Sequence, residues 1–384
     1  MIARVYFDYN ATAPLRPEAR AAMLDALAAV GNASSVHAEG REARRRIEVA
    51  RNAVARLVGG DPKLVTFTSG GTEANDTVLT PDWQLHGERS VFGALLVGAT
   101  EHVSVLSGGR FPPERVRPIP VDGNGIVKVE ALAELLANGE RALVSVMLAN
   151  NETGVIQPVA EVARLAHAAG AMVHCDAIQA AGRVSVDIAS LGVDALTLSA
   201  HKIGGPQGAG AIVRAREDLT VAPLIRGGGQ EKRLRAGTEN VAAIAGFGAA
   251  ADAAGADLAS AKGWAVWRDR LAAIIRAGGP PATVFGEGAD RLPQTLCIGL
   301  DGIAAETLLI ALDLAGVAVS SGSACSSGKV APSHVLAAMD VPSRHAKSAI
   351  RLSLGWESKE SDLHFFASAW QHVLKHVAPR HQAA

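Results

Sequence analysis

Residues 142–176 read ALVSVMLANNETGVIQPVAEVARLAHAAGAMVHCD, and their pattern indicates the fold class of the protein. An apolar run opens it, a second apolar run closes it, and the segment between them has the apolar spacing of a helix. Pro158 suits the first turn of that helix and Gly170 suits its end. Two short apolar strands joined by a helix form the repeating unit of a parallel sheet with helices on both faces.

The same alternation of short apolar runs and helical patterns continues on both sides of this stretch. We therefore predict an α/β fold whose large domain has a mixed, mainly parallel sheet flanked by helices. In such sheets ligands gather at the carboxyl ends of the strands, so the residues after each run are the candidates for function. The predicted strands are Leu64–Ser69, Ala94–Ala99, Ala142–Leu148, Ala171–Asp176, Asp194–Ala200 and Gly210–Ala215.

The pattern changes in the last third of the chain. Residues 249–275 predict one long helix with a break at Gly255. Shorter β-like runs follow at Gln294–Leu300 and Gly316–Ser321, before a last helix near Leu363–His376. We predict a second, smaller α+β domain here. The predicted division is residues 14–252 for the large domain, and residues 1–13 together with 253–384 for the small one.

The composition argues against several classes of function. Lys plus Arg (37) nearly balances Asp plus Glu (38), and a net charge of −1 disfavours nucleic acid or an anionic membrane as a partner. The opening MIARVYFDYN lacks the pattern of a secretory signal and no apolar run has the length of a membrane span, so we expect a cytoplasmic protein. The 3 cysteines are far apart and form no CxxC pair, which argues against a zinc cluster and against disulfides. Cys175 and Cys297 fit buried positions in or beside strands.

The remaining cysteine stands in an unusual context, the stretch SGSACSSGK of residues 321–329. Only small residues surround Cys325, whereas a thiol is usually buried. A phosphate loop is excluded, because five residues separate Gly322 from Gly328 where four are needed, and Val330 stands in place of Ser or Thr. With a metal ligand and a disulfide already weakly supported, a nucleophile is the remaining interpretation.

A glycine turn follows the first predicted strand, in SGGTEAN (Ser69–Asn75). Gly70 and Gly71 let the backbone approach a ligand closely. The first amides of the next helix, together with the hydroxyl of Thr72, would form a cup for an anion such as phosphate. Because glycine turns before helices are common, the cup alone is a weak signal.

Two charged residues follow buried runs, Asp176 in HCDAIQ and Lys202 in SAHKIGGPQG. A lysine at a strand end is normally just solvated, and a nearby carboxylate can be a plain salt-bridge partner. Pyridoxal phosphate (PLP), however, needs a lysine for its aldehyde, an acid opposite its ring nitrogen and an anion cup for its phosphate. Together the three features predict a PLP site.

Three further segments fit the same site. His102 follows a strand, where an imidazole can stack on a ring or transfer a proton, although an ordinary loop histidine would look the same. The amides of NNETG (Asn150–Gly154) suit hydrogen bonds to a substrate or to the ring oxygen. The glycine-rich stretch 227–240 carries Thr238, which is either a further phosphate donor or part of a plain loop.

Taken in order, these motifs resemble those of the cysteine desulfurases of the NifS/IscS type, which are class V, fold-type I PLP enzymes. The resemblance runs roughly from Tyr6 to Trp356, and the number and order of the motifs make it specific. Two departures concern fine contacts: Ala236 stands where serine is usual, and the stretch after Glu73 reads ANDT, where an asparagine commonly stands one position later. The matching stretches are DYNATAPLRP, SGGTEAN, EHVSV, NNETGVIQP, HCDAIQ, SAHKIGGPQG, GGGQEKRLRAGTEN, SSGSACSSG and AIRLSLG.

The resemblance implies a role for each matching residue. Lys202 would bind PLP covalently, Asp176 would pair with its ring nitrogen, and His102 would stack on the ring and assist proton transfer. Asn151 and Arg351 would hold the substrate carboxylate, the arginine through a bidentate pair. The other cofactor contacts would come from Gly71, Thr72, Gln179, Ser199 and His201, and from Thr238 across the interface of a homodimer.

The implied reaction converts L-cysteine into L-alanine and leaves the sulfur on Cys325 as a persulfide. A sulfur-acceptor or iron–sulfur scaffold protein would then take the sulfur, and a Gly/Ser loop suits such travel. No metal site is implied, apart from Cys325 as a transient ligand of an iron–sulfur cluster. The alternative is selenocysteine lyase or another class V PLP enzyme, but an aminotransferase has no use for the thiol of Cys325.

Overall fold

The structure, a computed structural model, describes residues 4–321 and 333–377. Its largest sheet consists of β2 (Val65–Thr68), β5 (Ala94–Gly98), β6 (Val116–Ile119), β7 (Ala142–Ser145), β8 (Met172–Asp176), β9 (Ala195–Ser199) and β10 (Gly210–Arg214). The strand order is β2-β10-β9-β8-β7-β5-β6. Strands β5 to β9 run parallel, and β10 is antiparallel to both of its neighbours. The predicted mixed, mainly parallel sheet is therefore confirmed.

Both faces of this sheet are buried, because its strands are apolar on both sides. On β5, Leu95 and Val97 belong to one hydrophobic cluster and Leu96 to another, as side-chain alternation requires. The cluster of Leu96 includes residues of α2 (Ala38–Leu57), α5 (Val129–Leu136), α6 (Val159–Ala168), α7 (Ile188–Leu191) and α8 (Val241–Asp257). The other includes residues of α3 (Gly71–Val78), α4 (Val103–Leu106), β3 (Asp82–Leu85) and β11 (Leu219–Val221). Strands β11 and β3 form a small antiparallel sheet with β4 (Glu88–Val91).

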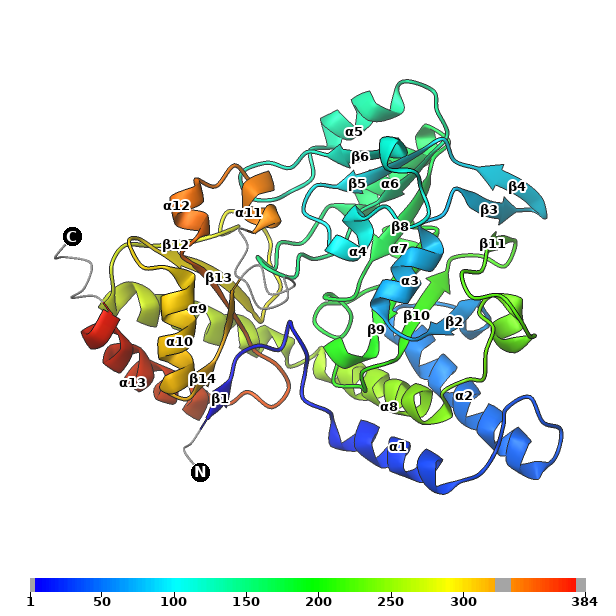
Figure 1. Cartoon of the computed structure of the whole chain (residues 1–384), viewed down its shortest axis with the longest axis horizontal. Coiled ribbons are helices and arrows are strands. Elements are labelled where there is room, and N and C mark those ends of the chain that lie inside the picture. Colours follow the sequence, from blue (N-terminus) through cyan, green and yellow to red (C-terminus); the bar gives the residue numbers. More distant parts are fainter. Residues whose placement is uncertain (1–3, 322–332, 378–384) are drawn as a thin grey trace.

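A second core lies at the end of the molecule that holds both termini, on the left in Figure 1. Its antiparallel sheet has the order β12-β13-β16-β15, from Ala282–Val284, Thr295–Leu300, Ala349–Ser353 and Ser320–Ser321. The main helices around it are α9 (Ala261–Gly278), α10 (Ala305–Leu314) and α13 (Glu360–Val377). Strand β1 (Val5–Tyr6) pairs with β14 (Val317–Ala318), which brings the start of the chain to this core. The remaining helices are α1 (Pro17–Ala28), α11 (His334–Ala338) and α12 (Ser343–Ala346). The predicted division at residues 13/14 and 252/253 stays a prediction.

The prediction of one long helix over residues 249–275 is wrong in the position of its break. Gly255 lies inside α8, and the interruption falls between Asp257 and Ala261. A single glycine costs a helix only about 1 kcal/mol, so packing can keep it helical. A Cβ on Gly255 would lie 3.8 Å from Leu57 Cδ1 of α2, an ordinary packing distance.

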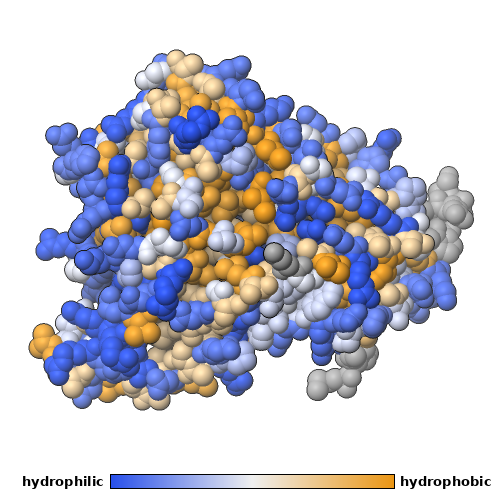
Figure 2. All heavy atoms as spheres, turned by 180° about the vertical axis from the view of Figure 1, so that it is seen from behind, coloured by the Kyte–Doolittle hydropathy of each residue, from blue (hydrophilic) through white to orange (hydrophobic). Residues whose placement is uncertain are grey.

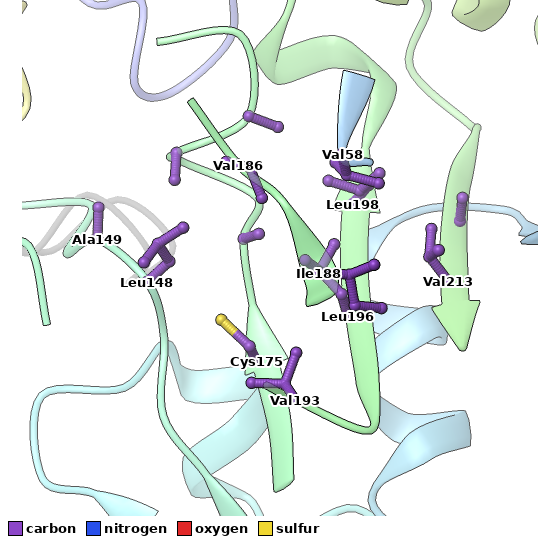
Figure 3. Packing of buried hydrophobic residues seen from close by; sticks show 14 of the residues in the cluster. Val58, Leu148, Ala149, Cys175, Val186, Ile188, Val193, Leu196, Leu198 and Val213 are labelled. Carbon is purple, nitrogen blue, oxygen red and sulfur yellow. The ribbon is translucent and has the colours of Figure 1, made fainter. Parts of the chain in front are cut away.

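The two cysteines that the structure describes are buried, as expected. Cys175 lies on β8 and Cys297 on β13, and each is 0% exposed. Figure 3 shows Cys175 among Leu148, Val193 and Leu196. Within residues 4–321 and 333–377, none of the helices has the length and hydropathy that crossing a bilayer requires.

Candidate active site

Polar side chains converge where the strands of the central sheet end. β2, β5, β7, β8 and β9 all present their carboxyl ends at one edge, where a cavity of about 320 Å³ lies. The predicted residues that line it are Gly71, Thr72, His102, Asn151, Asp176, Gln179, Ser199, His201, Lys202 and Arg351. Two predicted residues are not part of this group. Thr238 lines another cavity, of about 170 Å³, and Cys325 lies outside the described residues.

Asp176 is the last residue of β8 and is 5% exposed. Burial raises the pKa of its carboxyl group. Hydrogen bonds from Asn75 Nδ2 (2.8 Å) and from the amide of Ile178 (2.9 Å) act against this rise, as do the nearby His102 and Lys202. An acid supported in this way can face a cationic ligand group in a buried site.

Lys202 ends a short 3₁₀ turn, Ala200–Lys202, that follows β9. Its Nζ donates to the carbonyl oxygens of Asn10 (2.6 Å) and Ala11 (2.9 Å). Its own carbonyl oxygen accepts from Nη2 of the buried Arg183 at 2.7 Å. The backbone and the amine of this lysine are therefore both held at the wall of the cavity.

The start of α3 follows the glycine turn, at the position where the sequence predicts an anion cup. Within the described residues no side chain caps this helix, so its first amides and Thr72 are available to a ligand. A Cβ on Gly71 would lie 2.3 Å from Ile178 Cδ1, so only glycine fits without movement. Burial, and then the charge of Lys202, lowers the pKa of His201 to about 4, which makes its imidazole neutral near pH 7.

Arg351 reaches the cavity from β16, on the second sheet. Its Nη2 lies 2.7 Å from Asp8 Oδ1, and its Nη1 donates to the backbone carbonyl of Asn151 at 3.0 Å. The guanidinium is thus held from two sides, which fixes its plane for a carboxylate ligand. Asn151 contacts the arginine through its main chain.

His102 precedes α4 and is the N-cap of that helix. Its Nδ1 accepts from the amide of Ser104 (3.2 Å) and lies 2.8 Å from Ser104 Oγ. Burial is the main cause that lowers its pKa. Gln179 donates through Nε2 to the carbonyl of Asn10 (2.9 Å), whereas no donor in the described part of the chain reaches its buried Oε1.

Sequence reasoning missed three residues of this site. Asp8 and Asn10 belong to DYNATAPLRP, a stretch that matched the family without a role of its own. Asp8 contacts Arg351 from the opposite end of the chain, and the carbonyl oxygen of Asn10 accepts from Lys202. Asn75 belongs to the SGGTEAN motif, and the signal for it is its place one turn into the helix after the glycines.

The comparisons with known proteins agree on one family. The sequence model of the protein family "Aminotransferase class-V" matches residues 5–366 of this chain. The cysteine desulfurase of Cereibacter sphaeroides is 44% identical and covers 91% of this chain and 90% of its own. The cysteine desulfurase NifS of Azotobacter vinelandii is 39% identical, with 98% and 92% covered. The solved structure of a NifS-like protein from Rickettsia africae superposes with a TM-score of 0.86 at 34% identity, over 97% and 99% of the two chains. The chain therefore belongs to the class V aminotransferase family and, within it, to the cysteine desulfurases.

Proposed function

We propose that this enzyme is a PLP-dependent cysteine desulfurase that converts L-cysteine into L-alanine and collects the sulfur on Cys325. One observation carries the proposal: Lys202, Asp176 and Arg351, from three separate parts of the chain, line one cavity. A lysine, a buried acid and an arginine are the groups that a PLP enzyme needs for its aldehyde, its ring nitrogen and an amino-acid carboxylate.

The residues present fit PLP. The uncapped start of α3 offers amides to a phosphate, and Gly71, which lines the cavity, places no side chain between its backbone and a ligand. The buried Oε1 of Gln179, which accepts from no donor among the described residues, suits a polar group on a ligand. Lys202 would hold the cofactor covalently, and Asp176 would pair with its ring nitrogen. Bound PLP would supply an electron-withdrawing ring that makes the substrate Cα–H bond acidic.

The chain's own residues would carry out the rest of the reaction. Arg351 would bind the substrate carboxylate, and Nζ of Lys202 would take the proton from Cα. The Cys325 thiolate would attack the substrate Sγ, so that a sulfur–sulfur bond forms as the substrate Cβ–Sγ bond breaks. The electron pair stays on the carbon skeleton, which becomes alanine after protons are returned, with His102 placed to assist.

We further propose a homodimer that passes sulfur to an acceptor protein or iron–sulfur scaffold. Thr238 is separated from the site cavity within one chain, which supports its role across an interface. Figure 2 shows hydrophobic spheres at its lower left, the end that carries α1 and the start of α2. Exposed apolar residues here are Leu24, Leu27, Val30 and Val36. A cytoplasmic location agrees with the free thiols of Cys175 and Cys297.

Two variants test the proposal. Lys202→Ala should remove the visible absorption band of lysine-bound PLP and stop the production of alanine. Cys325→Ser should keep that band and lose protein-bound persulfide. Normal alanine production by Lys202→Ala, or unchanged release of sulfide by Cys325→Ser with a reductant, would contradict the assigned roles. A parallel assay with selenocysteine separates this proposal from a selenocysteine lyase.

A further inference from the structure

A chain of buried polar side chains runs behind Asp176, through the interior of the central sheet. Nδ2 of Asn75 donates to Asp176 Oδ2 at 2.8 Å, and Oδ1 of Asn75 accepts from Thr197 Oγ1 at 2.6 Å. Thr197 Oγ1 lies 3.0 Å from His174 Nε2, and His174 Nδ1 lies 2.9 Å from Ser145 Oγ. Asn75, Thr197, His174 and Ser145 are each 0% exposed, so water does not compete for these hydrogen bonds.

The protons in this chain follow from the orientation of the Asn75 amide, whose Nδ2 faces the carboxylate of Asp176. Thr197 has one hydroxyl proton, and it goes to Asn75 Oδ1, so Thr197 must accept from Nε2–H of His174. Burial lowers the pKa of His174 to about 3, so the ring is neutral and has only that one N–H. Its Nδ1 therefore accepts the proton of Ser145. Every donor points the same way, from Ser145 toward Asp176.

Asn75 also connects this chain to His102. Its Nδ2 lies 3.0 Å from Ser104 Oγ as well as 2.8 Å from Asp176 Oδ2, so its two N–H groups serve two acceptors. Ser104 Oγ lies 2.8 Å from His102 Nδ1, which already accepts from the amide of Ser104. The hydroxyl of Ser104 therefore donates to Nδ1, which leaves the proton of a neutral His102 on Nε2.

We propose that Ser145, His174 and Thr197 are positioning residues that hold Asn75 with its N–H groups toward Asp176 and Ser104. The hydroxyl of Thr197, which donates to Asn75 Oδ1, and the acceptor-only carboxylate of Asp176 together select this orientation of the Asn75 amide. In the reversed orientation its oxygen would face the carboxylate of Asp176. The acid would then lose a hydrogen bond that favours its charged form, and with it the partner that keeps a cofactor ring nitrogen protonated.

This inference rests on the proposed PLP-dependent function, but part of its test does not. In the apo-protein, ¹⁵N NMR of the histidines should find His174 neutral, with its proton on Nε2. This measurement needs no cofactor and no variant. A proton on Nδ1 of His174 would overturn the direction of the chain and the proposal with it.

The second measurement uses Thr197→Val, which removes the hydroxyl and keeps the branched shape. In the holoenzyme, loaded with PLP carrying a ¹⁵N ring nitrogen, we expect the nitrogen resonance to move toward the unprotonated position. The loss of one hydrogen bond to a charged acid predicts about a tenfold fall in kcat, with KM within about twofold. Thr197→Ser, which restores the hydroxyl, should recover both the resonance and kcat.

Thr66→Val is the matched control, because Thr66 is a buried threonine of β2 outside this chain. It should leave the ring resonance unchanged. An unchanged resonance and kcat in folded Thr197→Val would overturn the proposal, as would an equal effect of Thr66→Val. If wild-type protein binds no PLP, the proposed function fails, whereas the histidine measurement still decides the orientation of the chain.

Discussion

Glu152 is a buried carboxyl group whose ionisation we expect to destabilise the fold near neutral pH. It is 2% exposed, and Ser333 Oγ donates to its Oε2. Burial raises its pKa from 4.5 to about 7, although the nearby Arg351 acts in the opposite direction. We predict that Glu152→Gln, which resembles the protonated acid and can still accept from Ser333, removes a pH-dependent loss of stability.

The sign follows from the bound protons. Between pH 4.5 and about 7 the folded chain holds a proton on Glu152 that the unfolded chain has released. The contribution of this proton to stability is therefore present at low pH and lost as the pH rises through about 7. Since one pKa unit corresponds to about 1.4 kcal/mol, the shift from 4.5 to about 7 corresponds to a total loss of about 3 kcal/mol in the free energy of unfolding. From about pH 5.5 to about pH 8.5, the wild-type free energy of unfolding should fall by about 2 kcal/mol relative to Glu152→Gln.

Urea unfolding followed by tryptophan fluorescence at both pH values measures this difference. Glu134→Gln, at an exposed position of α5, is the matched control and should follow the wild type at both pH values. A parallel pH dependence of wild type and Glu152→Gln would contradict a raised pKa of Glu152 in the folded chain. It would mean that Glu152 is already ionised in the folded chain at about pH 5.5.

Three other substitutions test separate contacts. Arg51→Met should lower the free energy of unfolding by about 3–5 kcal/mol, because it leaves the buried carboxylate of Glu231 without its bidentate partner at 2.8 Å. Adding Glu231→Leu should recover most of this loss of stability, since no buried charge is then left unpaired. Arg351→Lys should raise KM for L-cysteine at least about tenfold and change kcat less, since an ammonium cannot hold a carboxylate in the same bidentate way. An unchanged KM would show that Arg351 does not bind the substrate. Gly71→Ala places a Cβ 2.3 Å from Cδ1 of Ile178, so we expect the affinity for PLP to fall about tenfold. Spectral titration with PLP measures this affinity. An unchanged affinity would show that the Ile178 side chain turns away from the new methyl group.

The central sheet could be predicted from the sequence because its strands are apolar on both faces. The six predicted runs correspond to β2, β5, β7, β8, β9 and β10, and each run is one to three residues longer than its strand. The run at residues 142–148 was too long because Val146 and Leu148 stay apolar and buried after β7 ends at Ser145. By contrast, β16 contains the polar Arg351 and Ser353, so its sequence lacks the continuous apolar run that predicted the other strands.

The cavity residues could be predicted where they lie at or just after the end of an apolar run, as Asp176 and Lys202 do. Contacts between distant segments could not, since spacing along one chain does not show that Asp8 meets Arg351. The sequence contains a signal that could have located one of the buried polar residues behind Asp176. His174 stands two positions before Asp176, so on a strand the two side chains point to the same face of the sheet.

The pairing of Asp8 with Arg351 also has a consequence for the order of synthesis. These residues are 343 positions apart, and Asn10 similarly donates to Thr295. At usual elongation rates, roughly 20–70 s separate the emergence of Asp8 from that of Arg351. The central sheet can form on the ribosome during this time, but the wall of the cavity that contains Arg351 cannot. A nascent chain released before β16 would therefore contain the lysine and the acid without a complete active site.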